Sequence, residues 1–196
     1  MIFDISQEIF SSEVYPGDPI PKKEKLLSLN NEKSDICQLT RLIIGSHSGT
    51  HLDAPLHFYK DGKDVEQIEL EKCVGECKVV SANGKIKEEE IYKWVKDGTK
   101  RLLIKGKIDL DSFQAKCLVK SGIYCIGVEQ STVGFGEEQE KVHKILLGAE
   151  VVIIEGLRMN EVIDGKYFLS ALPLKMKGLD GSPIRAILID RKEEKE

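Results

Sequence analysis

Short apolar runs and amphipathic stretches alternate along most of this chain. The apolar runs are typical of buried strands, and the amphipathic stretches repeat their apolar positions with the period of a helix. Strands are expected over residues 1–10, 26–29, 36–44, 75–82, 101–104, 122–128, 151–154 and 184–189. Helices are expected over residues 64–71, 87–96, 109–120 and 137–147, with Gly148 ending the last. This alternation predicts an α/β fold with a largely buried sheet.

Neither a linker nor a repeat of fixed period divides the 196 residues. The length suits one domain with a substantial core, which we expect to cover residues 1–190. The charged tail, residues 191–196, is expected to fray.

Charge and composition exclude several partners. The net charge is −4 and no basic stripe is present, so nucleic acid is not an expected partner. No apolar run approaches the ~20 residues that cross a bilayer, and no signal peptide is visible. The five cysteines lack the spacing of a redox or zinc motif, which favours idle thiols in a reducing cytoplasm.

The histidines concentrate in one segment. Residues 45–58 read GSHSGTHLDAPLHF and hold three of the four histidines. If this segment is extended, alternate side chains share a face, and Gly49 leaves room there for an ion. Four side chains would then lie together: His47, His51, Asp53 and His57. Imidazole and carboxylate suit zinc, manganese and related divalent ions, so we expect a metal site.

Other interpretations of the same segment stay open. A helix would also bring His47 and His51 together, as in metalloprotease helices. Ser48, Gly49 and Thr50 are poor helix formers, so the extended form is preferred, with a bend near Pro55. Each histidine taken alone would more simply be an ordinary polar or half-buried side chain.

Two later residues add to this pattern. Glu155 ends the most apolar strand, where burying an acid is costly unless it is paired or binds a cation. The alternative is that this strand has reached solvent at Glu155. His143, the fourth histidine, lies on the helix expected before Gly148.

Several motifs resemble one family in the same order along the chain. Residues 47–58 resemble the HxGTHxDxPxHF signature of the metal-dependent cyclase-like hydrolases, which include the bacterial kynurenine formamidases (arylformamidases). Residues 15–19 resemble the family's WPGD loop, and residues 154–157 its late acidic strand. Residues 172–174 and 180–186 resemble its C-terminal segment.

The resemblance implies a fold and a metal site. The fold would be a single-domain mixed sheet with flanking helices, of the swivelling β/β/α type. Two divalent ions would be bound, usually zinc and in some members manganese. The implied roles are one ion on His47 and His51, the other on His143, bridging acids Asp53 and Glu155, and His57 as general acid/base.

The implied activity is amide hydrolysis by a metal-activated water, with N-formylkynurenine as the leading substrate and formate and kynurenine as products. Tyr15 stands where the formamidases carry a tryptophan that stacks on the substrate, and residues 129–132 also depart from their pattern. A cyclic-amide hydrolase of the isatin type is therefore an alternative, as is a non-catalytic relative that binds a metal or small molecule. A homodimer or homotetramer is implied as well.

Overall fold

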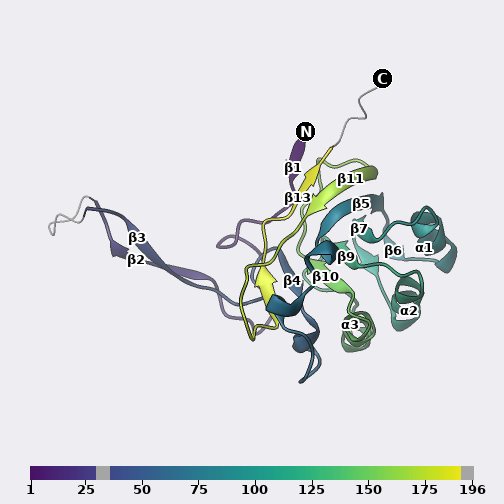
Figure 1. Ribbon diagram of the computed structural model, residues 1–196, viewed down its shortest axis with the longest axis horizontal. Helices are drawn as coiled ribbons and strands as arrows, with labels where there is room; N and C mark the ends of the chain where they lie inside the picture. Colours follow the sequence, from purple (N-terminus) through teal and green to yellow (C-terminus); the bar gives the residue numbers. More distant parts are fainter. Residues whose placement is uncertain (30–35, 191–196) are drawn as a thin grey trace.

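The computed structural model describes residues 1–29 and 36–190, so the expected tail at 191–196 and the expected link between the second and third strands lie outside it. Its centre is a nine-stranded sheet (Figure 1) in the order β1-β13-β11-β5-β7-β9-β10-β4-β12. The strands are β1 (Ile2–Asp4), β4 (His51–Asp53), β5 (Val74–Ser81), β7 (Arg101–Lys105), β9 (Cys125–Val128), β10 (Val152–Glu155), β11 (Gly165–Ser170), β12 (Gly181–Pro183) and β13 (Ile187–Ile189).

This sheet is mixed. The four central strands β5, β7, β9 and β10 are parallel, and the flanking strands pair antiparallel. Two further pairs stand apart from it, β2 (Lys22–Leu27) with β3 (Leu39–Ile43) and β6 (Gly84–Lys85) with β8 (Ile108–Asp109). The expected α/β class, with a mixed sheet and flanking helices, is confirmed.

Three α-helices flank the sheet: α1 (Glu88–Val95), α2 (Ser112–Lys120) and α3 (Glu138–Gly148) (Figure 1). Alternation along each strand divides the apolar side chains between two cores. On β7, Leu102 and Ile104 belong to the core that includes residues of all three helices, while Leu103 belongs to the other. A central strand buried on both faces explains why its sequence is apolar throughout.

Truncating Leu103 should therefore be costly. Leu103 is 0% exposed, and Leu103→Ala is expected to lower the free energy of unfolding by about 2–5 kcal/mol, because it leaves a cavity. Leu174→Ala, at a side chain that is 57% exposed, should stay within about 0.5 kcal/mol. Urea denaturation of both variants would measure this difference, and equal effects would contradict the assignment of Leu103 to a core.

Several expected elements differ from the structure. The helix expected over residues 64–71 is two separate 3₁₀ turns, η2 (Val65–Gln67) and η3 (Leu70–Lys72). Asp64 and Gln67 cap each other reciprocally, which closes the first turn after three residues. The strand expected over residues 1–10 stops at Asp4, where its pairing with β13 ends.

The end of α3 also differs from expectation. Gly148 lies inside the helix, and Glu150 adopts the positive φ of 55° beyond it. A Cβ on Gly148 would stand 2.6 Å from the Tyr59 hydroxyl. The glycine thus allows a close approach by Tyr59, whose Oη donates a hydrogen bond to the Lys144 carbonyl (2.6 Å).

None of the helices in the described part of the chain has the length and apolarity needed to traverse a membrane. The five cysteines are all free, four of them buried and Cys37 exposed.

Candidate metal centre and active site

Strand β4 places the first two side chains of the site. It lies between β10 and β12, with His51 opposite Glu155 and Asp53 opposite Gly181. Cross-strand neighbours share a face of the sheet. The expected pairing of His51 with Asp53, two residues apart in an extended strand, thus holds, and Glu155 joins them from the neighbouring strand.

The rest of the histidine segment is not extended. The chain already turns at Gly49, which has a φ of +66°, so His47 approaches from a turn before β4. Pro55 starts a 3₁₀ turn, η1 (Pro55–His57), and the expected bend there brings His57 back toward His47. The interpretation of residues 47–57 as one extended face is wrong, because Gly49 and Pro55 impose turns on either side of β4.

Gly181 makes room for the His47 ring. A Cβ at Gly181 would stand 2.6 Å from His47 Cε1. A side chain at this position of β12 would therefore displace the ring from the site.

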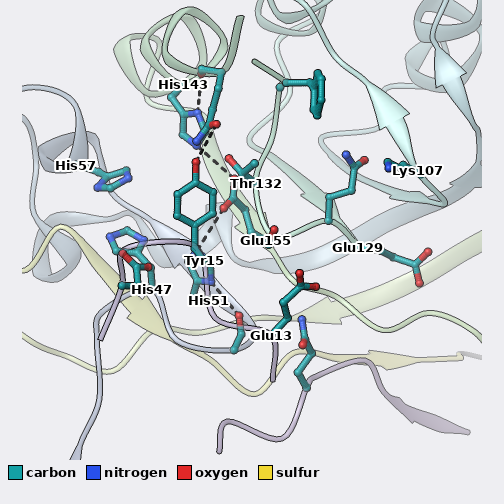
Figure 2. A pocket seen from close by; sticks show the side chains of 18 of the residues that line it. Glu13, Tyr15, His47, His51, His57, Lys107, Glu129, Thr132, His143 and Glu155 are labelled. Carbon is teal, nitrogen blue, oxygen red and sulfur yellow. Dashed lines mark hydrogen bonds and ion pairs between the residues drawn. The ribbon is translucent and has the colours of Figure 1, made fainter. Parts of the chain in front are cut away.

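Two buried acids, Asp53 and Glu155, face two imidazole nitrogens at the centre of the site. Figure 2 shows one of them, Glu155, with His51 and His143. His51 Nε2 lies 3.4 Å from Glu155 and 3.6 Å from Asp53. His143, on α3, has its Nε2 3.3 Å from Glu155 and 3.6 Å from Asp53. His143 lies 92 residues after His51 in the chain, and Glu155 lies 102 residues after Asp53. The four side chains nevertheless meet at one point, as the sequence analysis expected.

The second ring nitrogens of these histidines are already engaged. Nδ1 of His51 donates to the Gly49 carbonyl (3.0 Å), and Nδ1 of His143 donates to the Gln139 carbonyl (2.8 Å). Since a carbonyl oxygen only accepts, each neutral ring presents the lone pair of Nε2 to the acids. A backbone acceptor that fixes the ring in this way is typical of histidines that bind metals.

The donor set fits a cation. Hydrogen bonds between nitrogen and oxygen span about 2.7–3.2 Å, and all four Nε2–carboxylate distances are longer. Asp53 Oδ2 is buried and, among the described residues, has no hydrogen-bond partner. A cation between these groups would satisfy that oxygen and the imidazole lone pairs together.

The charges in the site shift the pKa values of its side chains. Burial lowers the pKa values of His51 and His143. The nearby carboxylates outweigh this effect, with the hydrogen bond to Glu155 contributing most, so both pKa values are raised. For Asp53, burial raises the pKa, and the neighbouring histidines, His47 first, reverse this and lower it. The neighbouring histidines thus favour the ionised, negatively charged form of Asp53.

His47 lies between two carboxylates. Its Nδ1 is 2.9 Å from Asp53 Oδ1, and its Nε2 is 2.9 Å from Asp180 Oδ2. Burial lowers the pKa of His47, but these two hydrogen bonds, that to Asp180 first, raise it to about 10. His47 would have to give up one of these carboxylates in order to bind an ion.

Asp180 is a site residue that the sequence analysis did not single out. Its Oδ2 accepts from His47 and lies 3.2 Å from Nδ1 of His57, and Ser46 donates to its Oδ1 (2.9 Å). The hydrogen bonds from His47 and His57 hold the pKa of Asp180 well below its usual range. The only indication in the sequence was its place at the start of the C-terminal segment 180–186.

His57 lies beside the cluster and not between the acids. Its ring lies against that of His47, tilted by 35° with centroids 4.1 Å apart, and its centroid is 6.1 Å from that of His143. Ligand atoms of His57, His47 and Asp53 lie within 4.8 Å of one another, as do those of His51, Asp53 and Glu155. The geometry therefore offers two overlapping groups of three donors.

A pocket of about 460 Å³ opens onto these side chains. Tyr15 lines it, is 38% exposed, and donates to Gln139 Oε1 (3.1 Å). Figure 2 shows the Tyr15 ring in front of the histidine cluster, with Glu129 and Lys107 on the far side of the pocket. This volume suits a small-molecule substrate.

The stretch at residues 129–132, which departs from the formamidase pattern, is engaged with the backbone. Glu129 accepts from the amides of Gly106 (2.7 Å) and Met159 (2.8 Å), and the Gln130 side chain accepts from that of Ile108 (2.7 Å). Both side chains are therefore fixed at the pocket wall by hydrogen bonds to neighbouring stretches of backbone.

Comparison with known proteins agrees with the motifs. Residues 3–134 match the family model described as putative cyclase. A kynurenine formamidase of Bacillus anthracis is 33% identical over 94% of this chain and 95% of its own. A solved structure described as a predicted metal-dependent hydrolase from Bacillus stearothermophilus is 30% identical, with a TM-score of 0.80 over 97% of this chain and 98% of that one.

Isatin hydrolase A from Labrenzia aggregata shares the fold, with a TM-score of 0.82 over 97% of this chain and 94% of that one, at 20% identity. The extent of the family match, and the identity to relatives along nearly their whole length, show that this chain belongs to the putative cyclase family of metal-dependent hydrolases.

Proposed function

We propose that this protein is a metal-dependent amide hydrolase that converts N-formylkynurenine to kynurenine and formate. The observation that carries the proposal is the pair of buried acids, Asp53 and Glu155, facing the Nε2 atoms of His51 and His143. The similarity to a kynurenine formamidase over nearly the whole of both chains supports the choice of substrate.

Two divalent ions, zinc or manganese, would be held by the proposed ligands: His47, His51 and His143, with Asp53 and Glu155 bridging. Both metals accept this mixed set of imidazole and carboxylate ligands. Bound ions of this kind lower the pKa of a water molecule and polarise a carbonyl oxygen, which is the chemistry that amide hydrolysis requires.

His57 would carry the proton. Asp180 lies 3.2 Å from Nδ1 of His57, so that Nδ1–H is the hydrogen-bond donor and Nε2 is left to exchange a proton in the pocket. In the proposed reaction, water adds to the formyl carbon, the carbon–nitrogen bond breaks, and His57 delivers the proton to the departing arylamine. Formate and the free amine are the products.

Tyr15 would stack on the aryl ring of the substrate. It lines the same pocket as Glu155 and His143, and its phenol ring offers an aromatic face with less area than a tryptophan. A cyclic amide of the isatin type would meet the same groups, and the shared fold of isatin hydrolase A makes that activity the second candidate.

Metal removal should separate an enzyme from a binding protein. We expect a chelator to abolish hydrolysis of formylated aryl amines and zinc or manganese to restore it, because the proposed reaction uses a metal-activated water. The assay would compare N-formylkynurenine, isatin and simple esters at equal concentration. Chelator-resistant turnover, or inactivity of the metal-loaded protein toward every substrate, would contradict the proposal.

The remaining parts of the proposal concern the whole molecule. We propose a homodimer or homotetramer formed by one domain at residues 1–190. The five free cysteines favour a reducing compartment, the cytoplasm.

A further inference from the structure

Arg158 brings a positive charge to the pocket, close in sequence to a proposed metal ligand. Glu155 is the last residue of β10, and Gly156 follows it with a φ of +70°. Beyond this turn, Arg158 lines the same pocket as Glu155 and His143. A guanidinium group thus shares the pocket with the candidate metal centre.

Gln7 holds this guanidinium in place. Its Oε1 accepts a hydrogen bond from Arg158 Nη2 (3.0 Å), and its Nε2 donates to the Gly156 carbonyl (2.7 Å). The Gln7 amide donates to Thr50 Oγ1 (2.8 Å), which in turn donates to the same carbonyl (2.6 Å). A Cβ at Gly156 would stand 2.6 Å from Gln7 Nε2, so a larger residue there would disturb this arrangement. Both ends of the Gln7 amide group are engaged, and the arginine is therefore positioned before a ligand binds.

No acid balances the charge of Arg158. Its guanidinium bonds the neutral Gln7 amide and lies 3.4 Å from the Leu157 carbonyl, and it forms no ion pair with any residue in the ranges 1–29 and 36–190. A guanidinium has five N–H donors, so most of them remain for a ligand. Donors in this fork geometry bind a carboxylate through two parallel hydrogen bonds. Arg158 is therefore suited to a carboxylate that enters the pocket.

The other charged side chains of the pocket are placed differently. The carboxylate of Glu129 already accepts from two backbone amides. Lys107 Nζ has no hydrogen-bond partner in the described part of the chain, so nothing fixes it toward a ligand. Glu13, labelled in Figure 2, is an exposed acid that lines the pocket. The pocket thus offers a fixed cation for a carboxylate and an acid for an ammonium group, and an α-amino acid carries both.

We propose that Arg158 binds the carboxylate of the substrate and thereby selects amides that carry an amino-acid group. This inference rests on the proposed amide hydrolysis and chooses between its two candidate substrates. N-formylkynurenine ends in an α-amino acid, whereas isatin carries no charged group. Only N-formylkynurenine would use Arg158, and the contact lies at the end of the substrate remote from the reacting formyl carbon.

Arg158→Gln tests this role on two substrates, N-formylkynurenine and ortho-formamidoacetophenone, which is the same aryl formamide without the amino-acid group. The variant should lose about 10–100-fold in kcat/KM on N-formylkynurenine, the range for a hydrogen bond to a charged group. The loss should fall on KM, because a remote contact stabilises the ground and transition states equally. Activity on ortho-formamidoacetophenone should be unchanged, and Arg158→Lys should recover part of the loss. The matched control is Arg185→Gln, at an arginine that is paired with Asp4 and lies outside the pocket.

Binding of the amine products gives a readout that needs no turnover. In calorimetry, the native metal-loaded protein should bind kynurenine about 10–100-fold more tightly than ortho-aminoacetophenone, and Arg158→Gln should remove this preference. Equal binding of the two amines by the native protein, or an undiminished preference in Arg158→Gln, would overturn the proposal. An equal loss in Arg185→Gln, or a loss in Lys107→Gln without one in Arg158→Gln, would overturn it as well. Inactivity of the native protein toward every formamide would refute the proposed hydrolysis, and the binding comparison would still decide the role of Arg158.

Discussion

His57→Ala should keep its metal and lose most of its turnover. The ring of His57 lies against that of His47 at the edge of the cluster, and this change leaves the proposed ligands His51, His143 and the two acids in place. Removing a general acid/base typically slows a reaction by about 10²–10⁴-fold. The measurement is kcat on N-formylkynurenine, with metal content determined by elemental analysis of the same preparation.

His51→Ala is the matched comparison, because it removes an imidazole whose Nε2 faces both buried acids. We expect this variant to lose metal together with activity. The donor atoms of His57, His47 and Asp53 also lie within 4.8 Å of one another, so His57 has the geometry to act as a ligand. Equal metal loss in the two variants would assign it that role and refute the division proposed here.

Asp53→Asn should remove the metal and the activity together. Asp53 contacts three imidazole rings, those of His47 (2.9 Å), His51 (3.6 Å) and His143 (3.6 Å), and is 0% exposed. Asparagine keeps the shape of the side chain but removes its charge and one acceptor oxygen. The ions would then lose a bridging ligand, and the effect should exceed the about 10–100-fold loss typical of residues that only orient ligands.

Asp180→Asn provides the control, since it makes the same chemical change at a carboxylate that contacts His47 and His57 and is not a proposed ligand. It should retain metal and lose about 10–100-fold in activity, because Asp180 orients the two rings. Elemental analysis and kcat would be compared for both asparagine variants. Equal metal loss in both would show that Asp53 has no special place in binding the ions.

Local pattern sufficed where neighbouring residues in the chain act together. The two-residue period of a strand placed His51 beside Asp53, and the cost of burying an acid singled out Glu155. The α/β class followed from alternating apolar runs and amphipathic stretches, and three of the four expected helices formed. The resemblance to the family supplied the proposed role of His143, which the sequence pattern alone would have left as an ordinary helix residue.

Turns inside the histidine segment were harder to predict. The expectation of one extended face from His47 to His57 ignored the turn at Gly49, whose φ of +66° only the folded chain reveals. The rings nevertheless meet, because the turns on both sides of β4 fold back toward it. Composition and spacing thus singled out side chains that lie close together in the fold, although the predicted local geometry was partly wrong.

The sequence by itself determined the chemistry available to this protein: which ligands it carries, where its strands are buried, and which family it resembles. Only the tertiary structure decided which of these groups meet. Asp180 reaches His47 because β12 pairs with β4. The expected pair of strands β2 and β3 also stands apart from the main sheet, which only the fold shows. Strand pairing between residues far apart in the chain is set by the packing of the whole core, so no local pattern could reveal that Asp180 meets His47.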